Sequence, residues 1–361
     1  MEKVKVLVVD DSAFMRKLIT SFLEEDQRFE IVGIARNGQD AVQKAKLVSP
    51  DVITMDVEMP ILNGIEALQE IMKSNPIPVV MLSSTTKEGA ENTMLAFQYG
   101  AVDFITKPSG AISLDLHKVK DDILEKVYYA SKVKQEKLRR YSEPLKTSIP
   151  YVENCSKIDN KEKVLRKFES KKKLVCIGTS TGGPRALQQV ITNLPKDIDA
   201  PILIVQHMPP GFTKSLASRL DSLSLLEVKE AEDGEIIQNG VAYIAPGGFH
   251  LKVRKVGASL AVQLEQTPPK NGHRPSVDVM FESISKIPDY GKIAVIMTGM
   301  GSDGTEGLKT MKSSGDVQCI AESEDTSIVF GMPKSAIASQ MVDYVTNLDE
   351  ISTQITKLLL K

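Results

Sequence analysis

Short apolar runs that end in polar residues recur along the first half of the chain. They lie at 4–9, 30–35, 51–56, 78–83 and 103–107. Segments with apolar residues at helical spacing separate them, as at 13–23 and 41–48. Strands that alternate with helices at this spacing predict a parallel, doubly wound α/β sheet.

The same alternation returns in the second half. Apolar runs predict strands at 174–177, 201–206, 241–245, 292–298, 317–320 and 342–345, and helices are expected near 212–220 and 305–313. This half is therefore also predicted to be α/β with mainly parallel strands. Ligands bind at the carboxyl ends of such strands, so polar residues at those ends are the first candidates for function.

The length and the middle of the chain suggest two domains. A chain of 361 residues exceeds what one core usually serves. Residues 124–172 begin with a helix-like apolar stripe and then become rich in charged residues, Ser and Pro. We expect domains at 1–123 and 173–361, joined by a partly helical linker at 124–172. A basic nucleic-acid-binding arm is an alternative for the linker, but its interspersed Glu and Asp disfavour it.

Composition excludes several classes of protein. With 42% hydrophobic and 25% charged residues the chain resembles an ordinary soluble protein, and its net charge of −2 argues against general nucleic-acid binding. No apolar run reaches the roughly 18 residues of a spanning helix, and the first residues do not resemble a signal peptide. Cys155, Cys176 and Cys319 are widely spaced, which suits a reducing cytoplasm better than a disulfide framework or a zinc site.

Five polar residues follow strands of the first half. Asp10, Asp11 and Asp56 are three carboxylates expected at one sheet edge, where they repel one another unless a hard cation such as Mg²⁺ joins them. Ser83 and Lys107 are expected nearby and can bind phosphoryl oxygens. Unrelated polar residues at strand ends are the alternative, but five suitable groups together favour a site.

This pattern, Asp10-Asp11, Asp56-x-x-Met59-Pro60, Ser83 and Lys107-Pro108, resembles the receiver domain of two-component response regulators. The resemblance covers the whole first half and implies a flavodoxin-like fold. It implies that Asp56 accepts a phosphoryl group from a histidine kinase. It also implies that Mg²⁺ is held by Asp10, Asp11, Asp56 and the Glu58 carbonyl. Ser83 and Lys107 would contact the phosphoryl group, and Phe104 would be the aromatic residue that switches position on phosphorylation.

A glycine-rich turn carries Ser180 in the second half. Gly178-x-Ser180-x-Gly182 follows an apolar run, and Pro184 suits the first turn of a helix. A serine between a strand and a helix N-terminus is a candidate nucleophile, because free N–H groups there can bind an oxyanion. A phosphate or dinucleotide loop uses the same geometry, and this stretch alone leaves both interpretations open.

His207 and Asp303 also follow apolar runs, so the three side chains can meet at one edge of a parallel sheet. An imidazole can take the proton of a serine hydroxyl, and a carboxylate can orient that imidazole. Taken singly, His207 could be a structural histidine and Asp303 a helix cap. Of the remaining histidines, His250 suits a structural role and His273 lies in a polar loop that can line a cleft.

The second half is similar to the catalytic domain of the chemotaxis receptor methylesterase (CheB) family. The motifs that carry the resemblance are Gly178–Gly183, Gln206–Phe212, Ile244–Gly248, His273–Asp278 and Thr298–Gly304. An N-terminal receiver and a linker are also that family's layout. The resemblance implies a Rossmann-like α/β domain and roles for six residues: Ser180 as nucleophile, His207 as base, Asp303 as orienting acid, Thr181 and Met300 as oxyanion-hole donors, and Arg274 in the substrate cleft.

The resemblance further implies the reaction and its setting. The substrate is the γ-methyl ester of glutamate on methyl-accepting chemotaxis receptors, methanol is released, and receptor glutamines are deamidated as well. Ester hydrolysis needs no cofactor. The expected phosphodonor is the chemotaxis histidine kinase. Binding to nucleic acid and insertion into a membrane are not expected. The protein is expected in the cytoplasm, where it acts at receptor arrays on the inner face of the membrane. We expect the resting receiver to obstruct Ser180, although phosphorylation could instead position the active site.

Three other functions fit the sequence less well. A DNA-binding response regulator requires a recognition helix and a basic face, whereas the second half holds several strands and a balanced charge. A nucleotide-binding domain is disfavoured because no Walker lysine follows Gly183 and the dinucleotide spacing is absent. A pseudo-enzyme scaffold is disfavoured by the presence of Ser180, His207 and Asp303.

Overall fold

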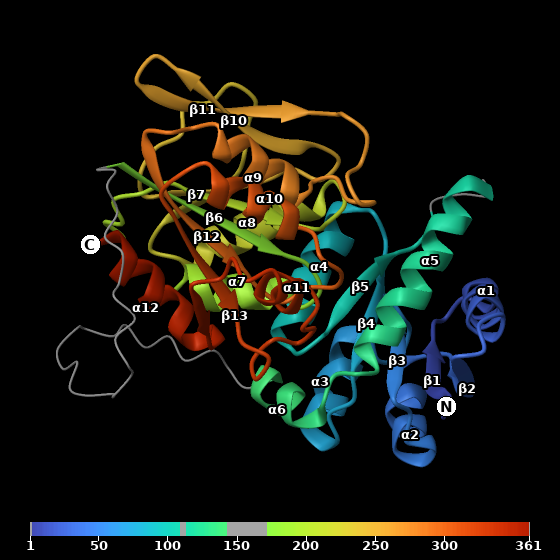
Figure 1. Ribbon diagram of the computed structural model, residues 1–361. Coiled ribbons are helices and arrows are strands. Elements are labelled where there is room, and N and C mark those ends of the chain that lie inside the picture. The colour runs from blue at the N-terminus through green and yellow to red at the C-terminus, as the bar shows by residue number, and fades with distance from the viewer. Residues whose placement is uncertain (1, 109–112, 143–171, 361) are drawn as a thin grey trace, which may run out of the picture.

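The computed structural model of the protein describes residues 2–108, 113–142 and 172–360. Two α/β units lie beside each other, each built on its own sheet (Figure 1). No helix in these three segments combines the length and the apolar character needed to cross a bilayer. The predicted division into two α/β units of mainly parallel strands is confirmed.

The first unit contains five parallel strands in the order β2-β1-β3-β4-β5. The central strands β3 and β4 are buried on both faces, which explains their continuous apolar sequence. The order reverses between β1 and β3, so the carboxyl ends of these strands flank the sheet's switch point. The strands are β1 Val4–Val9, β2 Phe29–Ala35, β3 Val52–Asp56, β4 Val79–Ser83 and β5 Asp103–Thr106.

Helices connect these strands and cover the sheet. Asn63 begins α3 with a capping box, in which its side chain accepts from Glu66 N and the Glu66 carboxylate accepts from Asn63 N. The helices are α1 Ala13–Glu24, α2 Gly38–Val48, α3 Gly64–Ser74, α4 Lys87–Gln98, α5 Ser113–Ala130 and α6 Gln135–Ser142.

The second unit contains seven parallel strands in the order β14-β13-β12-β6-β7-β9-β8. Its order reverses around β6, since β7 lies on one side of this strand and β12 on the other. The strands are β6 Lys172–Thr179, β7 Ile202–Gln206, β8 Glu227–Glu230, β9 Val241–Ile244, β12 Tyr290–Ile296, β13 Val317–Glu322 and β14 Tyr344–Thr346. The helices are α7 Gly183–Ile191, α8 Phe212–Leu223, α9 Val277–Ser285, α10 Thr305–Ser313, α11 Met332–Ala338 and α12 Leu348–Leu359.

An antiparallel hairpin stands apart from this parallel sheet. Strands β10 (His250–Val256) and β11 (Ser259–Glu265) form a separate two-stranded sheet over α9 (Figure 1). His250 is buried at its start, and its Nε2 lies 3.2 Å from the Pro268 carbonyl oxygen. This contact gives His250 a structural position.

The helix α5 runs through residue 123, where the sequence suggested that the first domain ends. Ile123 and Val127 are buried in the core of the first unit, and Leu138 of α6 joins the same cluster. We therefore propose that the first domain extends through α6. The remainder of the expected linker, 143–171, lies outside the described residues.

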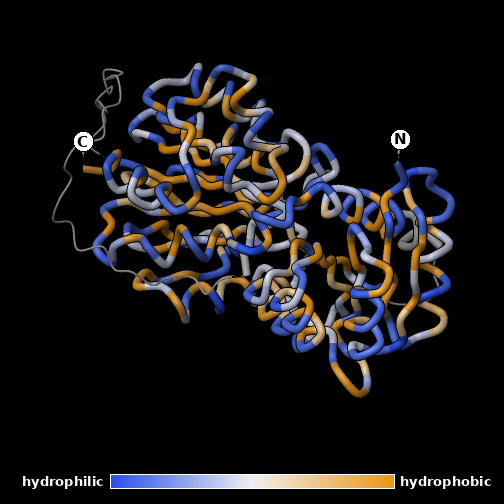
Figure 2. The backbone as a smooth tube through the Cα atoms, turned by 90° about the horizontal axis from the view of Figure 1, so that it is seen from below, coloured by the Kyte–Doolittle hydropathy of each residue, from blue (hydrophilic) through white to orange (hydrophobic). Residues whose placement is uncertain are grey.

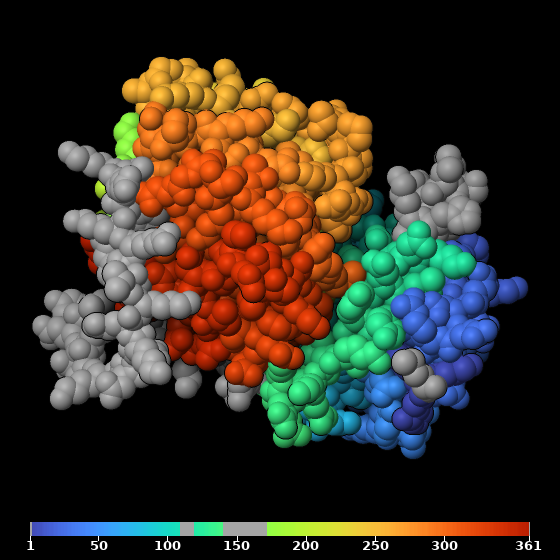
Figure 3. All heavy atoms as spheres, viewed as in Figure 1, coloured from blue at the N-terminus to red at the C-terminus, as the bar shows by residue number. Residues whose placement is uncertain are grey.

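The two units are in direct contact (Figures 2 and 3). Helix α4 packs against α8, and the rings of Phe104 and Phe212 stack with centroids 4.5 Å apart. Arg185 at the start of α7 donates to the Gln98 carbonyl over 2.9 Å. On the other side, Lys137 of α6 donates to the Ser327 carbonyl over 2.8 Å. The contact therefore joins the carboxyl edge of the second sheet to β5, α4 and α6 of the first unit.

Candidate active site and phosphorylation site

Ser180, His207 and Asp303 lie at the switch point of the second sheet. Ser180 follows β6, His207 follows the adjacent β7, and Asp303 lies in the loop after β12 on the other side of β6. Parallel strands bring these loops to one edge. The fold therefore places all three residues where the sequence analysis expected them.

Backbone contacts hold the turn that carries Ser180. Its N–H donates to the Thr298 carbonyl over 3.0 Å, and its carbonyl accepts from Gly183 N over 2.8 Å. Gly182 has a φ of 77°, which a residue with a side chain rarely adopts. A Cβ at Gly183 would lie 1.9 Å from Gln206 Oε1. These glycines let the chain turn into α7 without displacing the serine.

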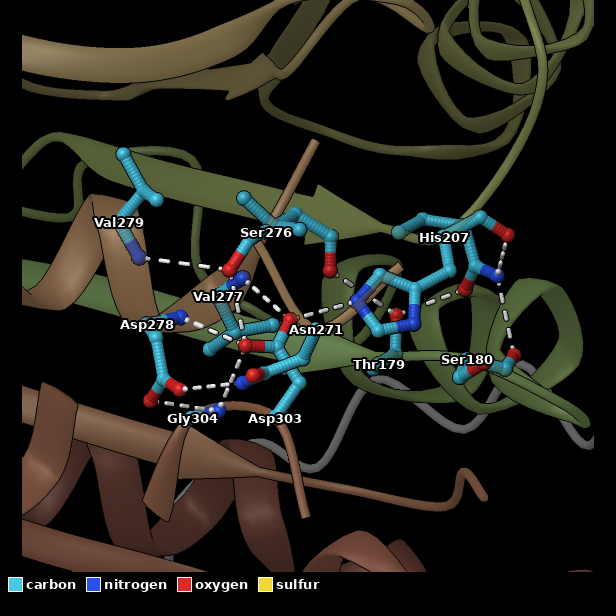
Figure 4. A network of polar contacts seen from close by, with 12 residues as sticks. Thr179, Ser180, His207, Asn271, Ser276, Val277, Asp278, Val279, Asp303 and Gly304 are labelled. Carbon is cyan, nitrogen blue, oxygen red and sulfur yellow. Dashed lines mark hydrogen bonds and ion pairs between the residues drawn. The ribbon is translucent and has the colours of Figure 1, made fainter. Parts of the chain in front are cut away.

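Asp303 holds one side of the His207 ring. Asp303 Oδ2 lies 2.7 Å from His207 Nε2 and accepts from Val277 N over 2.7 Å, while Oδ1 accepts from Ser276 Oγ and Asp278 N (Figure 4). Burial by itself would raise the pKa of Asp303. The hydrogen bond and charge of His207, with the backbone donors, outweigh burial and hold that pKa well below its usual range. A carboxylate held in this state fixes the tautomer of the imidazole.

The other nitrogen of His207 has no partner among the described residues. Nδ1 is buried, and within the described segments neither it nor the Ser180 hydroxyl forms a hydrogen bond. The structure thus joins His207 to Asp303 and does not form the serine–imidazole hydrogen bond. Such catalytic contacts are often long without substrate. The free Nδ1 is the atom available to accept a proton.

Two backbone N–H groups near Ser180 lack acceptors within the described part of the chain. They belong to Thr181 and Met300, and both residues line the same cavity as Ser180 and His207. Unpaired N–H groups beside a candidate nucleophile can stabilise a developing oxyanion. Arg274 lines the cavity too, and its Nη1 donates to the carbonyls of Gln266 and Thr267 at 3.3 and 3.0 Å.

The cavity lies between the two units and measures about 360 Å³. Ser180, His207 and Arg274 line one side, and Asp103 and Lys126 of the first unit line the other. The Thr181 hydroxyl donates to the Asp103 carboxylate across the boundary. The candidate nucleophile therefore faces the first unit.

Gln206 was not identified as a site residue from the sequence. Its Nε2 donates to the carbonyls of Ser180 and His207 at 2.9 and 3.1 Å, and its Oε1 accepts from Thr179 Oγ1 over 2.7 Å. One buried amide thus ties the serine turn to the histidine strand end. The feature of the sequence that could have identified Gln206 is its position as the polar last residue of an otherwise apolar strand.

The three acids of the first unit converge at its own switch point. Carboxylate oxygens of Asp10, Asp11 and Asp56 lie within 4.8 Å of one another. Lys107 Nζ lies 2.7 Å from Asp56 Oδ2 and 3.1 Å from Asp10 Oδ2. Glu58 follows in the next loop, and its N–H donates to Asp56 Oδ1 over 3.3 Å.

The electrostatics of this cluster suit a cation. Burial raises the pKa of Asp56 to about 6, and the Asp10 charge adds to this effect, whereas Lys107 opposes it. The Oδ2 atoms of Asp10 and Asp56 are buried, and among the described residues their partner is the Lys107 amine, in two ion pairs. Buried carboxylate oxygens with free lone pairs fit a hard cation such as Mg²⁺.

Ser83 and Phe104 have other contacts in this structure. The Ser83 hydroxyl donates to the Gly89 carbonyl over 3.0 Å and accepts from Thr93 over 2.9 Å, so it is engaged with α4. The Phe104 ring is buried against Phe212 of the second unit. The Ser83 hydroxyl is therefore held by α4, and the Phe104 ring is held by the contact between the two units.

Comparison with known proteins identifies a family for each unit. A family model described as CheB methylesterase matches residues 175–355, and one described as response regulator receiver domain matches residues 6–117. This chain belongs to the CheB methylesterase family. The first match spans the strands that carry Ser180, His207 and Asp303, and the second contains Asp10, Asp56 and Lys107.

Relatives of the family extend over the whole chain. A "Protein-glutamate methylesterase/protein-glutamine glutaminase" of Halalkalibacterium halodurans is 56% identical over 359 residues, which is 98% of each chain. The protein of the same name from Bacillus subtilis is 49% identical and covers 99% of both. A crystal structure of the Thermotoga maritima CheB methylesterase catalytic domain is 49% identical, with a TM-score of 0.50, over 52% of this chain and 98% of that one.

Proposed function

We propose that this chain is a phosphorylation-regulated serine esterase of chemotactic adaptation. It hydrolyses glutamate γ-methyl esters on methyl-accepting chemotaxis receptors, releases methanol, and deamidates receptor glutamines. The names of its full-length relatives and the two family matches support this activity. The observation that carries it is the His207 ring, bound to Asp303 by one nitrogen and free at the other, beside Ser180.

We propose the following roles in ester hydrolysis. Ser180 Oγ attacks the ester carbonyl while His207 Nδ1 takes its proton, and Asp303 stabilises the resulting imidazolium. The N–H groups of Thr181 and Met300 bind the oxyanion. His207 then gives this proton to the departing methoxide oxygen, which leaves as methanol. In the second half of the reaction a water molecule attacks the acyl-enzyme while His207 takes a proton from it, and His207 returns that proton to Ser180 Oγ. Arg274 shapes the cleft. These groups complete ester hydrolysis by themselves.

We propose that the first unit regulates this site through Asp56. A histidine kinase phosphohistidine donates its phosphoryl group to an Asp56 oxygen, and Lys107 pairs with the new charge. Asp10, Asp11, Asp56 and the Glu58 carbonyl would hold Mg²⁺, which neutralises phosphoryl charge when bound. Phosphorylation adds charge and acceptor oxygens that can bias a two-state surface.

The contacts between the units support obstruction of Ser180 by the unphosphorylated receiver. Asp103 engages the Thr181 hydroxyl, and the cavity around the serine is walled by residues of β5 and α5. We propose that the protein acts in the cytoplasm at receptor arrays on the inner membrane face, with the chemotaxis kinase and the receptors as partners.

Methanol release from methylated receptor membranes tests this function. We expect full-length protein to be active and to accelerate with a small phosphodonor plus Mg²⁺. Ser180→Ala should be inactive, because the substitution removes the proposed nucleophile. Asp56→Asn should release methanol at the basal rate, and the phosphodonor should not increase that rate.

The variants separate the two parts of the proposal. Wild-type turnover by Ser180→Ala would show that the nucleophile is assigned wrongly. A full response to the phosphodonor in Asp56→Asn would instead reject only the regulatory assignment.

A further inference from the structure

The ring of His273 lies flat on the ring of His207. The two centroids are 3.8 Å apart and the ring planes differ by 12°. His273 comes from the loop before α9, whereas His207 directly follows β7, so the contact joins two separate segments. Both residues line the cavity that contains Ser180.

A tight turn holds His273 in this position. The N–H of His273 donates to the Lys270 carbonyl over 3.0 Å, and Lys270 N donates back to the His273 carbonyl over 3.1 Å. The two residues between them, Asn271 and Gly272, have φ angles of 53° and 82°, typical of a two-residue hairpin turn. Asn271 Nδ2 donates to Asp278 Oδ2 over 3.3 Å, which anchors the turn to α9.

The contacts of the His273 ring are made by its face. Among the described residues, neither of its nitrogens forms a hydrogen bond, so the ring does not take part in a hydrogen-bond network here. Burial, followed by the neighbouring charge of His207, lowers the pKa of His273 to about 4. Asp303 opposes this change and Lys126 adds to it. His273 is therefore uncharged at neutral pH.

The geometry of His207 explains why such a neighbour matters. One hydrogen bond, from Nε2 to Asp303, fixes a single point of the imidazole. Rotation of the ring about its side-chain torsions would still change the direction in which Nδ1 points. A flat ring at stacking distance restricts that rotation, and stacked aromatic pairs are favourable beyond their burial.

We propose that His273 is a positioning residue for the reaction, whose ring holds the His207 imidazole with Nε2 toward Asp303 and Nδ1 toward Ser180. An uncharged ring also tolerates the imidazolium that forms on His207, because it adds no like charge beside it. The inference rests on the proposed roles of Ser180 and His207 and adds a residue that supports them.

The test uses the full-length chain with phosphodonor and Mg²⁺. We compare His273→Phe, His273→Leu and His273→Ala, with Gln266→Ala as a control for an exposed residue of the same loop. Two rates are measured: methanol release from methylated receptor membranes, as kcat and KM across pH, and the modification of Ser180 by a fluorophosphonate probe. Thermal melting shows whether each variant is folded.

We expect His273→Phe to keep a kcat close to wild type and the same pH profile, because it retains a flat, uncharged face. His273→Leu and His273→Ala should lose kcat by roughly tenfold, the upper range for one stacked aromatic pair, with little change in KM. The modification of Ser180 should slow in parallel. If His273→Ala does not fold, the comparison of His273→Phe with His273→Leu still tests whether a flat ring at this position is required.

Two results would overturn the inference. Wild-type kcat in both His273→Leu and His273→Ala would show that the stack is dispensable. Equal losses in the Phe and Leu variants, or a changed pH profile in His273→Phe, would show that the ring nitrogens act rather than the ring face. Fluorophosphonate modification that persists in Ser180→Ala would instead reject the proposed function itself.

Discussion

At the scale of single residues, Gln206 shows how one polar side chain couples two catalytic loops. Its amide donates to the carbonyls that follow β6 and β7, at Ser180 and His207, and accepts from Thr179. The side chain is 2% exposed, so water cannot replace these bonds. The distance between serine and histidine therefore depends on a residue that takes no part in the chemistry.

Gln206→Glu tests this coupling with almost no change of shape. The carboxylate can still accept from Thr179, but it cannot donate to the two carbonyls and repels them. We expect the rate of Ser180 modification by a fluorophosphonate to fall at least tenfold, and the free energy of unfolding to fall by about 1–3 kcal/mol. Gln189→Glu on α7 should change neither. An unchanged modification rate in Gln206→Glu would contradict the coupling.

At the scale of elements, the ends of β12 and β13 hold the candidate oxyanion-hole loop together. Glu322 Oε2 at the end of β13 accepts from Thr298 N over 2.8 Å, and Thr298 in turn accepts from Ser180 N through its carbonyl. Glu322 is fully buried, and its Oε1 has no hydrogen-bond partner in the part of the chain that the structure describes. Burial raises its pKa to about 7, although the Thr298 N–H opposes this effect.

This buried carboxyl makes stability depend on pH. Between its ordinary pKa of 4.5 and the folded value of about 7, the folded state holds the extra proton. The free energy of unfolding should therefore fall as pH rises through this window. Glu322→Gln has no such proton, so the stability of wild type relative to it should decrease from pH 4.5 to 8, by roughly 1–3 kcal/mol.

Denaturant unfolding of both proteins at several pH values measures the difference. Glu324→Gln, two residues away and exposed, provides the matched control and should follow wild type. A constant difference between wild type and Glu322→Gln across this range would show that Glu322 titrates normally.

At the scale of the whole molecule, the contact between the two units involves the loop of the candidate nucleophile and the strand that precedes Lys107. β5 leads into Lys107, which pairs with Asp56, and its first residues, Asp103 and Phe104, contact the second unit at Thr181 and Phe212. Lys126 of α5 lies 3.5 Å from Asp103 and donates to the Phe104 carbonyl over 2.7 Å. One strand thus connects the acceptor site to the loop of the nucleophile.

Asp103→Ala should weaken this docking and raise the basal rate of methanol release. A charge-assisted hydrogen bond is lost, so an increase of about tenfold is expected, together with a smaller further response to the phosphodonor. Asp121→Ala, an exposed acid of α5, is the control and should leave both unchanged. A lower basal rate in Asp103→Ala would mean that docking positions the active site instead of obstructing it.

The sequence by itself determined the two α/β units and the residues at their strand ends. Strand–helix alternation places Ser180, His207 and Asp303 on one edge and Asp10, Asp56 and Lys107 on another, because the carboxyl ends of parallel strands share an edge. Local composition carries this information, since apolar runs and turn residues depend on near neighbours. The motifs then identified the family.

Only the tertiary structure decided how side chains from distant segments meet. It paired Nε2 of His207 with Asp303, stacked His273 on His207, placed Gln206 beneath both loops and set Asp103 against Thr181. It also continued α5 past residue 123, because the burial of Ile123 and Val127 depends on the sheet they cover. Such contacts join residues far apart in the chain and depend on packing angles and rotamers, which periodicity and spacing do not encode.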